Sequence, residues 1–379
     1  MTWPPAPWTA QDGGGKLAGL RVLDLSNFLP GPFCTQMLAD LGADVLKVEP
    51  PSGDPARHLP DGMYLVANRN KRSVTLDLKQ ADHQDALRRL AAEADVFVEG
   101  FRPGVAERLG AGYEALSRLA PGLVYCSVSG YGQQGPARDK GGHDLTFLAA
   151  SGALSVSPQW GQAPHRSGVP IADLAASSYA AVAILTALRE RDRTGQGCHL
   201  DVAIAESSLA FISPRCGPDF GSDPTLAAYP SNDIFATADG RSLAVAAVEE
   251  KFWSALTRVL GRVDERVADA RFGTPQGRRD HGDELSALLK SIFARQTLAE
   301  WLAVFQGVDV PVEPVLTAAE AARSPQVRQR GVVQSCEGEE QIVFPVLENG
   351  VPLGRFRARA PKPGQHTDQF LAAFATVET

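Results

Sequence analysis

The chain has 379 residues, of which 44% are hydrophobic and 21% charged, and its formal net charge is −7 at pH 7. One hydrophobic core rarely grows beyond about 250–300 residues, so we expect two domains. The composition is that of an ordinary soluble globular protein. The acidic balance, with no basic block to offset it, argues against nucleic acid or an anionic membrane as the main partner.

No unbroken apolar run reaches the ~18–20 residues that a membrane span requires, so we expect no membrane partner. Residues 1–16 lack the basic start and apolar middle of a signal peptide and are expected to form a loose tail. The five cysteines are scattered and odd in number. They have no CxxC spacing for zinc and are too sparse for a disulfide framework. We therefore expect a cytoplasmic protein without a metal.

The first part of the chain alternates short strands with helical stretches. Helical patterns cover 33–41 and 82–93, and strand-type runs cover 20–26, 44–48, 73–78, 96–99 and 123–129. Such alternation is typical of a parallel sheet with helices on its faces. We predict an α/β fold whose large domain is Rossmann-like.

The first strand-to-helix turn bears on the choice of cofactor. Its sequence, Phe28-Leu29-Pro30-Gly31-Pro32, lacks the G-x-G-x-x-G that brings backbone close to a pyrophosphate. Glu49 ends the second strand, where dinucleotide enzymes keep an acid for the ribose. Without the glycines, this acid does not indicate NAD or FAD. No GxxxxGK[ST] is present, which excludes a P-loop.

Two composition breaks divide the rest of the chain. After an Ala-rich helix from Asp173 to about 191, a strand over 198–204 and a helix over 205–212, residues 213–230 carry four prolines and form a predicted linker. Residues 231–307 are predicted to form a small α+β domain that opens with a hairpin. Residues 308–316 form a second linker. The large domain then comprises residues 17–212, and residues 317–379 follow the second linker.

Two motifs thirty residues apart carry candidate catalytic groups. One places His143 after a glycine pair, and the other places Asp173 at a helix start. An imidazole and a carboxylate on opposite faces of a carbon can remove a proton from one side and return it on the other. The helix terminus would favour an ionised Asp173 and supply N–H groups to an enolate oxygen. The structural alternatives are a helix N-cap for Asp173 and a hydrogen-bonded core histidine for His143. Asp144 would point away from His143 in an extended chain.

From residue 17 onward the chain resembles the class III (CaiB/BaiF-type) CoA-transferase family, which includes the α-methylacyl-CoA racemases. The matching motifs are LAGLRVLDL (17–25), LGADVLKVEPP (41–51), NRNKRSVTLDLK (68–79), EGFRPG (99–104), SGYGQQGP (129–136) and RTGQGCHLD (193–201). The resemblance implies CoA thioester substrates, no separate cofactor, and an intertwined homodimer. It also implies that residues 317–379 return to the large domain.

The resemblance leaves two reactions open. In the racemases, the residues matching His143 and Asp173 exchange protons with the substrate, and a glutamate matching Glu249 in VAAVEEKFW (245–253) lies beside the histidine. In the transferases, the residue matching Asp173 attacks the thioester carbonyl. Residues 175–178 (AASS) replace the glycines of typical racemases and favour the transferase. We favour the racemase because a transferase needs no histidine at 143. A non-catalytic acyl-CoA-binding relative is the third possibility, and a solvated surface position is the alternative for Glu249.

The phosphates of CoA require cations, which arginine can bind bidentately. The candidates are Lys47, Arg57, Lys71, Arg72 and Arg102. By resemblance, Lys47 and Arg102 match CoA-contacting positions and Arg57 lies in a loop over the ligand; an ordinary surface cation is the alternative for each. We thus predict an acyl-CoA racemase acting on a 2-methyl-branched acyl chain through an enolate. The acyl group stays open among bile-acid, branched fatty acyl, arylpropionyl and small dicarboxylate types.

Overall fold

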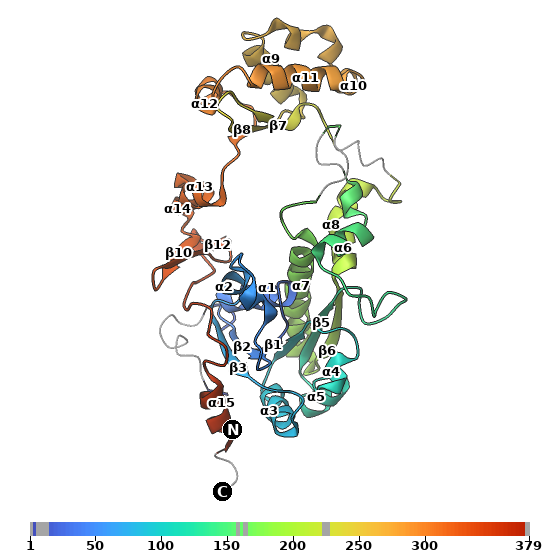
Figure 1. Cartoon of the computed structure of the whole chain (residues 1–379), viewed down its shortest axis with the longest axis vertical. Coiled ribbons are helices and arrows are strands. Elements are labelled where there is room, and N and C mark those ends of the chain that lie inside the picture. Colours follow the sequence, from blue (N-terminus) through green and yellow to red (C-terminus); the bar gives the residue numbers. More distant parts are fainter. Residues whose placement is uncertain (1–2, 5–14, 157–159, 162–165, 222–227, 376–379) are drawn as a thin grey trace. The chain divides into compact units, whose positions relative to one another are not determined.

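The computed structural model describes residues 3–4, 15–156, 160–161, 166–221 and 228–375. These residues form two compact units (Figure 1). The first unit contains the described residues up to Ser151, Ser167–Phe211, and those from Ala322 on. The second unit contains the described residues of Gly152–Arg166 together with those of Ile212–Ala321.

The first unit is built on a parallel sheet whose spatial strand order is β3-β2-β1-β4-β5-β6 (Figure 1). This is the order of doubly wound nucleotide-binding folds, so the predicted α/β class with a parallel sheet is confirmed. The strands are β1 (Arg21–Leu25), β2 (Asp44–Glu49), β3 (Lys71–Thr75), β4 (Val96–Glu99), β5 (Val124–Ser129) and β6 (Cys198–Ala203).

Burial explains why these short runs form strands. Every residue of β2, β4 and β5 is buried, as expected for strands covered on both faces. Leu23, Phe97 and Tyr125 belong to one hydrophobic core that also receives Leu87 and Leu90. The helices are α1 (Pro30–Asp40), α2 (Met63–Ala67), α3 (Ala81–Ala92), α4 (Val105–Arg108), α5 (Tyr113–Leu119), α6 (Asp144–Ala150), α7 (Ile171–Thr194) and α8 (Ile204–Cys216).

Helix α7 carries Asp173 near its start. With a mean hydropathy of 1.7 over 18 residues, α7 is long and apolar enough to cross a membrane by length and composition alone, which inspection for unbroken apolar runs did not reveal. In the structure it contacts α1, α6, β5 and β6. Ala175, Ala176 and Ser177 are fully buried, and Ser177 Oγ donates a hydrogen bond of 2.7 Å to the carbonyl of Pro30. These contacts cover part of α7, and 39% of its most apolar window is buried.

The C-terminal segment completes the first unit. Ser73 N donates to His366 Nδ1 at 3.1 Å and Thr75 N donates to Thr367 Oγ1 at 3.0 Å, so this segment covers the edge strand β3. Phe370 packs into the same core as β1. The segment contains α14 (Pro325–Arg330), β10 (Val333–Cys336), β11 (Glu339–Ile342), β12 (Leu347–Glu348), β13 (Val351–Pro352) and α15 (Thr367–Ala375). The boundary between the two units falls within α13 (Ala318–Arg323).

The second unit has a small antiparallel sheet of order β7-β8-β9. Gly240, with φ of +73°, turns the chain between β7 and β8, where the Asp-Gly pair predicts a hairpin. Phe235 and Phe293 stack at 4.6 Å in the core of this unit. Its elements are β7 (Asn232–Ala236), β8 (Ser242–Ala246), β9 (Val312–Pro314), α9 (Glu250–Leu260), α10 (Pro275–Asp280), α11 (Gly282–Phe293) and α12 (Leu298–Phe305).

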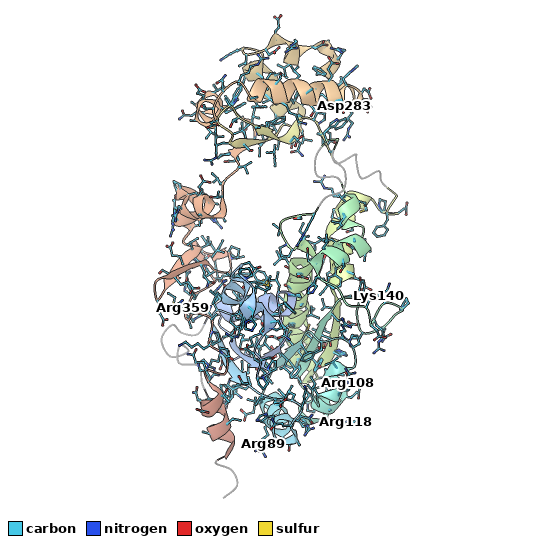
Figure 2. The ribbon with its side chains drawn as sticks, in the orientation of Figure 1. Arg89, Arg108, Arg118, Lys140, Asp283 and Arg359 are labelled. Atoms are coloured by element: carbon cyan, nitrogen blue, oxygen red, sulfur yellow. The ribbon has the colours of Figure 1, made fainter. Side chains whose placement is uncertain are left out.

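The described residues of 152–166, which lie between the two candidate catalytic motifs, group with the second unit. Trp160 Nε1 donates a hydrogen bond of 2.8 Å to Asp283 at the start of α11 (Figure 2). A Cβ at Gly282 would come within 1.9 Å of the Trp160 ring, so only glycine leaves room for it. The expected large domain, residues 17–212, runs unbroken through this stretch, whereas the structure separates the described residues of 152–166 from it.

Candidate active site

A cavity of about 320 Å³ opens at the carboxyl ends of β1, β4 and β5, and both His143 and Asp173 line it. Between β1 and β4 the strand order reverses, and open α/β sheets bind ligands in the crevice at that point. The volume lies in the range of small-molecule sites. The other lining residues include Asn27, Phe28, Gly31, Gly100, Phe101, Arg102, Ser129, Gly130, Arg138, Lys140 and Phe147.

His143 immediately precedes α6. Its backbone N–H donates to Thr146 Oγ1 at 3.0 Å, and Thr146 N donates to the His143 carbonyl at 2.8 Å, which fixes the start of the helix. The imidazole is exposed to the cavity and meets the Phe28 ring edge to face, with 5.7 Å between centroids. A Cβ at Gly142 would come within 2.5 Å of the Phe147 ring. The glycine before His143 therefore allows the turn to approach α6 closely.

Asp173 is the third residue of α7, and it is not the helix cap. Asp144 takes that role, because its Oδ1 accepts hydrogen bonds from Ala172 N at 2.8 Å and from Asp173 N at 3.3 Å. The expectation that these N–H groups stabilise an enolate oxygen is therefore wrong for these two donors. Asp144 lies in a helix rather than an extended strand, which is why it reaches α7.

The ionisation of Asp173 also differs from expectation. Burial, and secondarily the negative charge of Asp144, raises the pKa of Asp173 to about 7. The predicted stabilisation of the carboxylate by the helix dipole is outweighed by these two effects. A carboxyl group with a pKa near neutrality holds and releases a proton under physiological conditions, as a general acid or base must.

Three exposed cations surround the cavity: Arg102, Arg138 and Lys140. Arg102 was a candidate from the sequence. Its guanidinium packs against Gly141, since a Cβ added at Gly141 would lie 2.3 Å from Arg102 Nη2. Arg138 and Lys140 were missed; Lys140 lies on the segment between β5 and α6 (Figure 2). The signal for them was a basic pair just before the glycines of the histidine motif. Together these cations can hold a phosphate or diphosphate.

The other predicted CoA ligands already have protein partners. Lys47, Lys71 and Arg72 are almost completely buried, and they pair with Asp54 at 3.0 Å, with Asp24 at 2.8 Å and with Asp44 at 2.5 Å, respectively. Burial lowers the pKa of Lys71 to about 8, although Asp24 opposes this. Arg57 pairs with Glu49 at 2.6 Å. None of these four cations lines the cavity.

Glu249 lies in the second unit, where it is exposed and immediately precedes α9. Its neighbour Glu250 pairs with the buried Arg278. The two adjacent glutamates thus have different environments: of the two, only Glu250 forms an ion pair with a described residue of this unit. The proposed role of Glu249 beside the histidine stays a prediction.

Glu99, at the end of β4, holds the backbone of Phe101, which lines the cavity. Its carboxylate accepts a hydrogen bond of 2.7 Å from Phe101 N in the turn after β4. Burial raises the pKa of Glu99 to about 7. No group of three or more histidine, cysteine, aspartate or glutamate side chains among the described residues is arranged to hold a metal ion.

The sequence model of CoA-transferase family III matches residues 17–367, so the chain belongs to this family. The solved structure of a CaiB/BaiF family protein from Brucella suis superposes with a TM-score of 0.83 at 29% identity, covering 95% of this chain and 99% of that one. The predicted α/β fold with a parallel central sheet and the resemblance inferred from the motifs are thereby confirmed.

Relatives of similar identity carry out different reactions. The succinyl-CoA–D-citramalate CoA-transferase of Chloroflexus aurantiacus is 36% identical over 378 residues, covering 94% of this chain and 93% of the relative. The human α-methylacyl-CoA racemase is 35% identical over 378 residues, with the same coverage of 94% and 93%. Overall identity therefore does not separate the two reactions, and the choice depends on the site.

Proposed function

We propose that the protein is an acyl-CoA racemase that inverts the α-carbon of a 2-methyl-branched acyl-CoA. The observation that carries this proposal is a histidine and an aspartate with a near-neutral pKa on the wall of one cavity. Racemisation needs one group to accept a proton and another to donate one in the same turnover. The carboxyl group of Asp173 can donate a proton and the imidazole of His143 can accept one.

In one direction, His143 accepts the α-proton as the C–H bond breaks, and the electron pair moves onto the thioester oxygen to form an enolate. The carboxyl group of Asp173 then donates its proton to the opposite face of the α-carbon. The reverse turnover uses the same groups with exchanged roles. By resemblance, His143 serves the (S) face and Asp173 the (R) face. Because Asp144 occupies the first N–H groups of α7, the enolate requires other donors, and the side-chain amide of Asn27 on the cavity wall is one candidate.

The CoA portion would be bound through its phosphates. Arg102, Arg138 and Lys140 supply the cations beside the cavity. CoA enters as part of the substrate thioester, so this scheme uses no separate cofactor. Glu249 would hold the His143 imidazole in one tautomer, from the same or the partner subunit.

We also propose a homodimer. Helices α7 and α8 present exposed apolar side chains: Tyr179 is 41%, Val182 63% and Phe211 48% exposed. The centroids of the Tyr179 and Phe211 rings are 5.5 Å apart in an edge-to-face arrangement, so the two helices contribute to one apolar surface. Exposed apolar patches of this kind are typical of surfaces that another chain covers.

The second candidate is a CoA-transferase. Its support is the transferase from Chloroflexus aurantiacus, which is as similar as the human racemase, and the AASS sequence at 175–178. In that reaction the Asp173 carboxylate would attack the thioester carbonyl, and the CoA thiolate would leave. A pKa near 7 leaves part of the Asp173 population ionised at neutral pH, so both reactions have a competent form.

Deuterium exchange and covalent trapping distinguish the candidates. A racemase incubated with a 2-methylacyl-CoA in D₂O incorporates deuterium at the α-carbon and yields both epimers. His143→Ala and Asp173→Asn should each lower the rate of conversion between the epimers by about 10²–10⁴-fold. Asp82→Asn, an exposed carboxylate on α3 that does not line the cavity, is the control and should retain the rate. Absence of exchange, together with transfer of CoA to a free acid and an Asp173 ester trapped by hydroxylamine, would establish the transferase instead.

A further inference from the structure

Phe28, in the turn between β1 and α1, has an unusual backbone conformation. Its φ is +62°, the left-handed region that disfavours any residue with a Cβ, and the residue is not glycine. The side chain is 37% exposed and lines the cavity. A conformation of this kind persists only where the surrounding structure imposes it, and such positions cluster at functional sites.

A buried ion pair imposes this conformation. Phe28 N donates a hydrogen bond of 3.2 Å to Asp54 Oδ1, and the other oxygen of Asp54 lies 3.0 Å from Lys47 Nζ. Lys47 Nζ also donates to the carbonyl of Ser26 at 2.7 Å. Lys47 therefore holds the turn at residue 26 directly and at residue 28 through Asp54. Both charged side chains are fully buried.

The turn presents one aromatic ring to the catalytic histidine. The rings of Phe28 and His143 are 5.7 Å apart with an interplanar angle of 88°, a favourable edge-to-face arrangement. The imidazole stands at the exposed start of α6. The Phe28 ring restricts it from the side of β1.

We propose that Phe28 is a positioning residue for the His143 imidazole and that Lys47 and Asp54 hold Phe28 in place. This inference rests on the proposed function of His143. It assigns Lys47 a different role from the predicted one of binding CoA phosphate. An ammonium group without solvent exposure, paired with a carboxylate and a carbonyl, has no free side for a phosphate.

The first experiment compares three variants of Phe28. Phe28→Leu keeps apolar volume without an aromatic ring, and it should lower kcat for α-proton exchange by about tenfold while the KM changes little. Phe28→Tyr restores the ring and should recover most of the rate. Phe28→Gly removes the ring but accepts a positive φ, so it should unfold no more readily than the wild type and still lose activity as Phe28→Leu does. Equal kcat values for Phe28→Leu and the wild type would overturn the proposal.

The second experiment does not depend on turnover. In protein labelled with ¹⁵N-histidine, the His143 ring signals are assigned with His143→Gln and then followed in Lys47→Met. Because Lys47 acts on His143 only through the turn, we expect these signals to move, while the Kd for free CoA stays within about twofold. Unmoved His143 signals, with CoA affinity lowered about tenfold or more, would show that Lys47 binds phosphate.

Matched variants make these results interpretable. Arg102→Gln, at the cavity, should weaken the binding of free CoA by about tenfold, and it leaves Lys47 and the turn between β1 and α1 unchanged. If Lys47→Met does not fold, Asp54→Asn replaces it, because this variant keeps an oxygen acceptor for Phe28 N and removes the charge of Asp54. Unmoved His143 signals in Asp54→Asn would contradict the proposal that Lys47 and Asp54 position His143 through Phe28. A wild type without α-proton exchange would refute the racemase, whereas the histidine signals would still test the Phe28 contact.

Discussion

Replacing Asp173 by asparagine should stabilise the protein at alkaline pH while abolishing its activity. Burial and the charge of Asp144 raise the pKa of Asp173 from 3.8 to about 7. Between about pH 4 and about pH 7, the folded protein keeps a proton on Asp173 that the unfolded chain has released, so the free energy of unfolding falls as pH rises through this window. A difference of about 3 pH units corresponds to about 4 kcal/mol, which is an upper limit for a partly exposed side chain.

Urea unfolding of the wild type and Asp173→Asn at pH 5 and pH 8 measures this effect. At pH 5, about one pH unit above the pKa of the unfolded carboxyl, the variant should be more stable by only about 1–2 kcal/mol, because only the first part of that window has been crossed. At pH 8 the variant should be more stable by about 2–4 kcal/mol. Asp139→Asn is the control, because its side chain is 83% exposed and its replacement should change stability by less than about 0.5 kcal/mol at either pH. An equal stability difference at both pH values for Asp173→Asn would refute the argument.

Three further changes test the site and the assembly. Asp144→Asn removes the charge that helps raise the pKa of Asp173, so that pKa should fall. In a pH–rate profile of α-proton exchange, the midpoint that reflects ionisation of Asp173 should therefore move to lower pH, and an unchanged midpoint would contradict this coupling. Gly142→Ala places a Cβ 2.5 Å from the Phe147 ring and should cost about 1–3 kcal/mol of stability, with partial recovery in a double variant that adds Phe147→Leu; full stability of Gly142→Ala would refute the steric argument. Val182→Glu, on a side chain that is 63% exposed, should leave each subunit folded but yield monomers by light scattering, whereas a persistent dimer would place the interface elsewhere.

The sequence predicts the sheet well because most of its strands, such as β2, β4 and β5, are buried on both faces. The run at 123–129 is continuously apolar or small, and the structure forms β5 at Val124–Ser129 with every residue buried. The short elements after residue 317, such as β10 to β13, were not predicted. They contain two to four residues each, and they make contacts with distant parts of the chain: Gln341 in β11, for example, accepts a hydrogen bond of 2.9 Å from Arg69. No local periodicity encodes contacts of that kind.

The sequence motifs located candidate site residues but did not reveal the surroundings of their side chains. His143 and Asp173 do line one cavity, but three of the predicted phosphate ligands are buried in ion pairs. A lysine in a strand gives no sign of whether its end reaches solvent. Burial of Lys47 depends on Asp54, seven residues away in a loop, and that of Arg72 depends on Asp44 in the neighbouring strand. Such pairings appear only when the strands are assembled.

The turn between β1 and α1 shows what replaces a dinucleotide motif at this switch point. In dinucleotide enzymes, glycines let the backbone approach a pyrophosphate at the start of the first helix. Here the left-handed position is occupied by Phe28, at a cost of about 1–2 kcal/mol relative to glycine. In return, the turn presents an aromatic ring to His143 in place of bare backbone. A ring at this position obstructs close approach of a pyrophosphate to the turn, and it restricts an imidazole whose orientation matters for proton transfer. If the proposed function is correct, the same strand order accommodates acid–base chemistry on a thioester, and the cations that line the cavity would bind the phosphates.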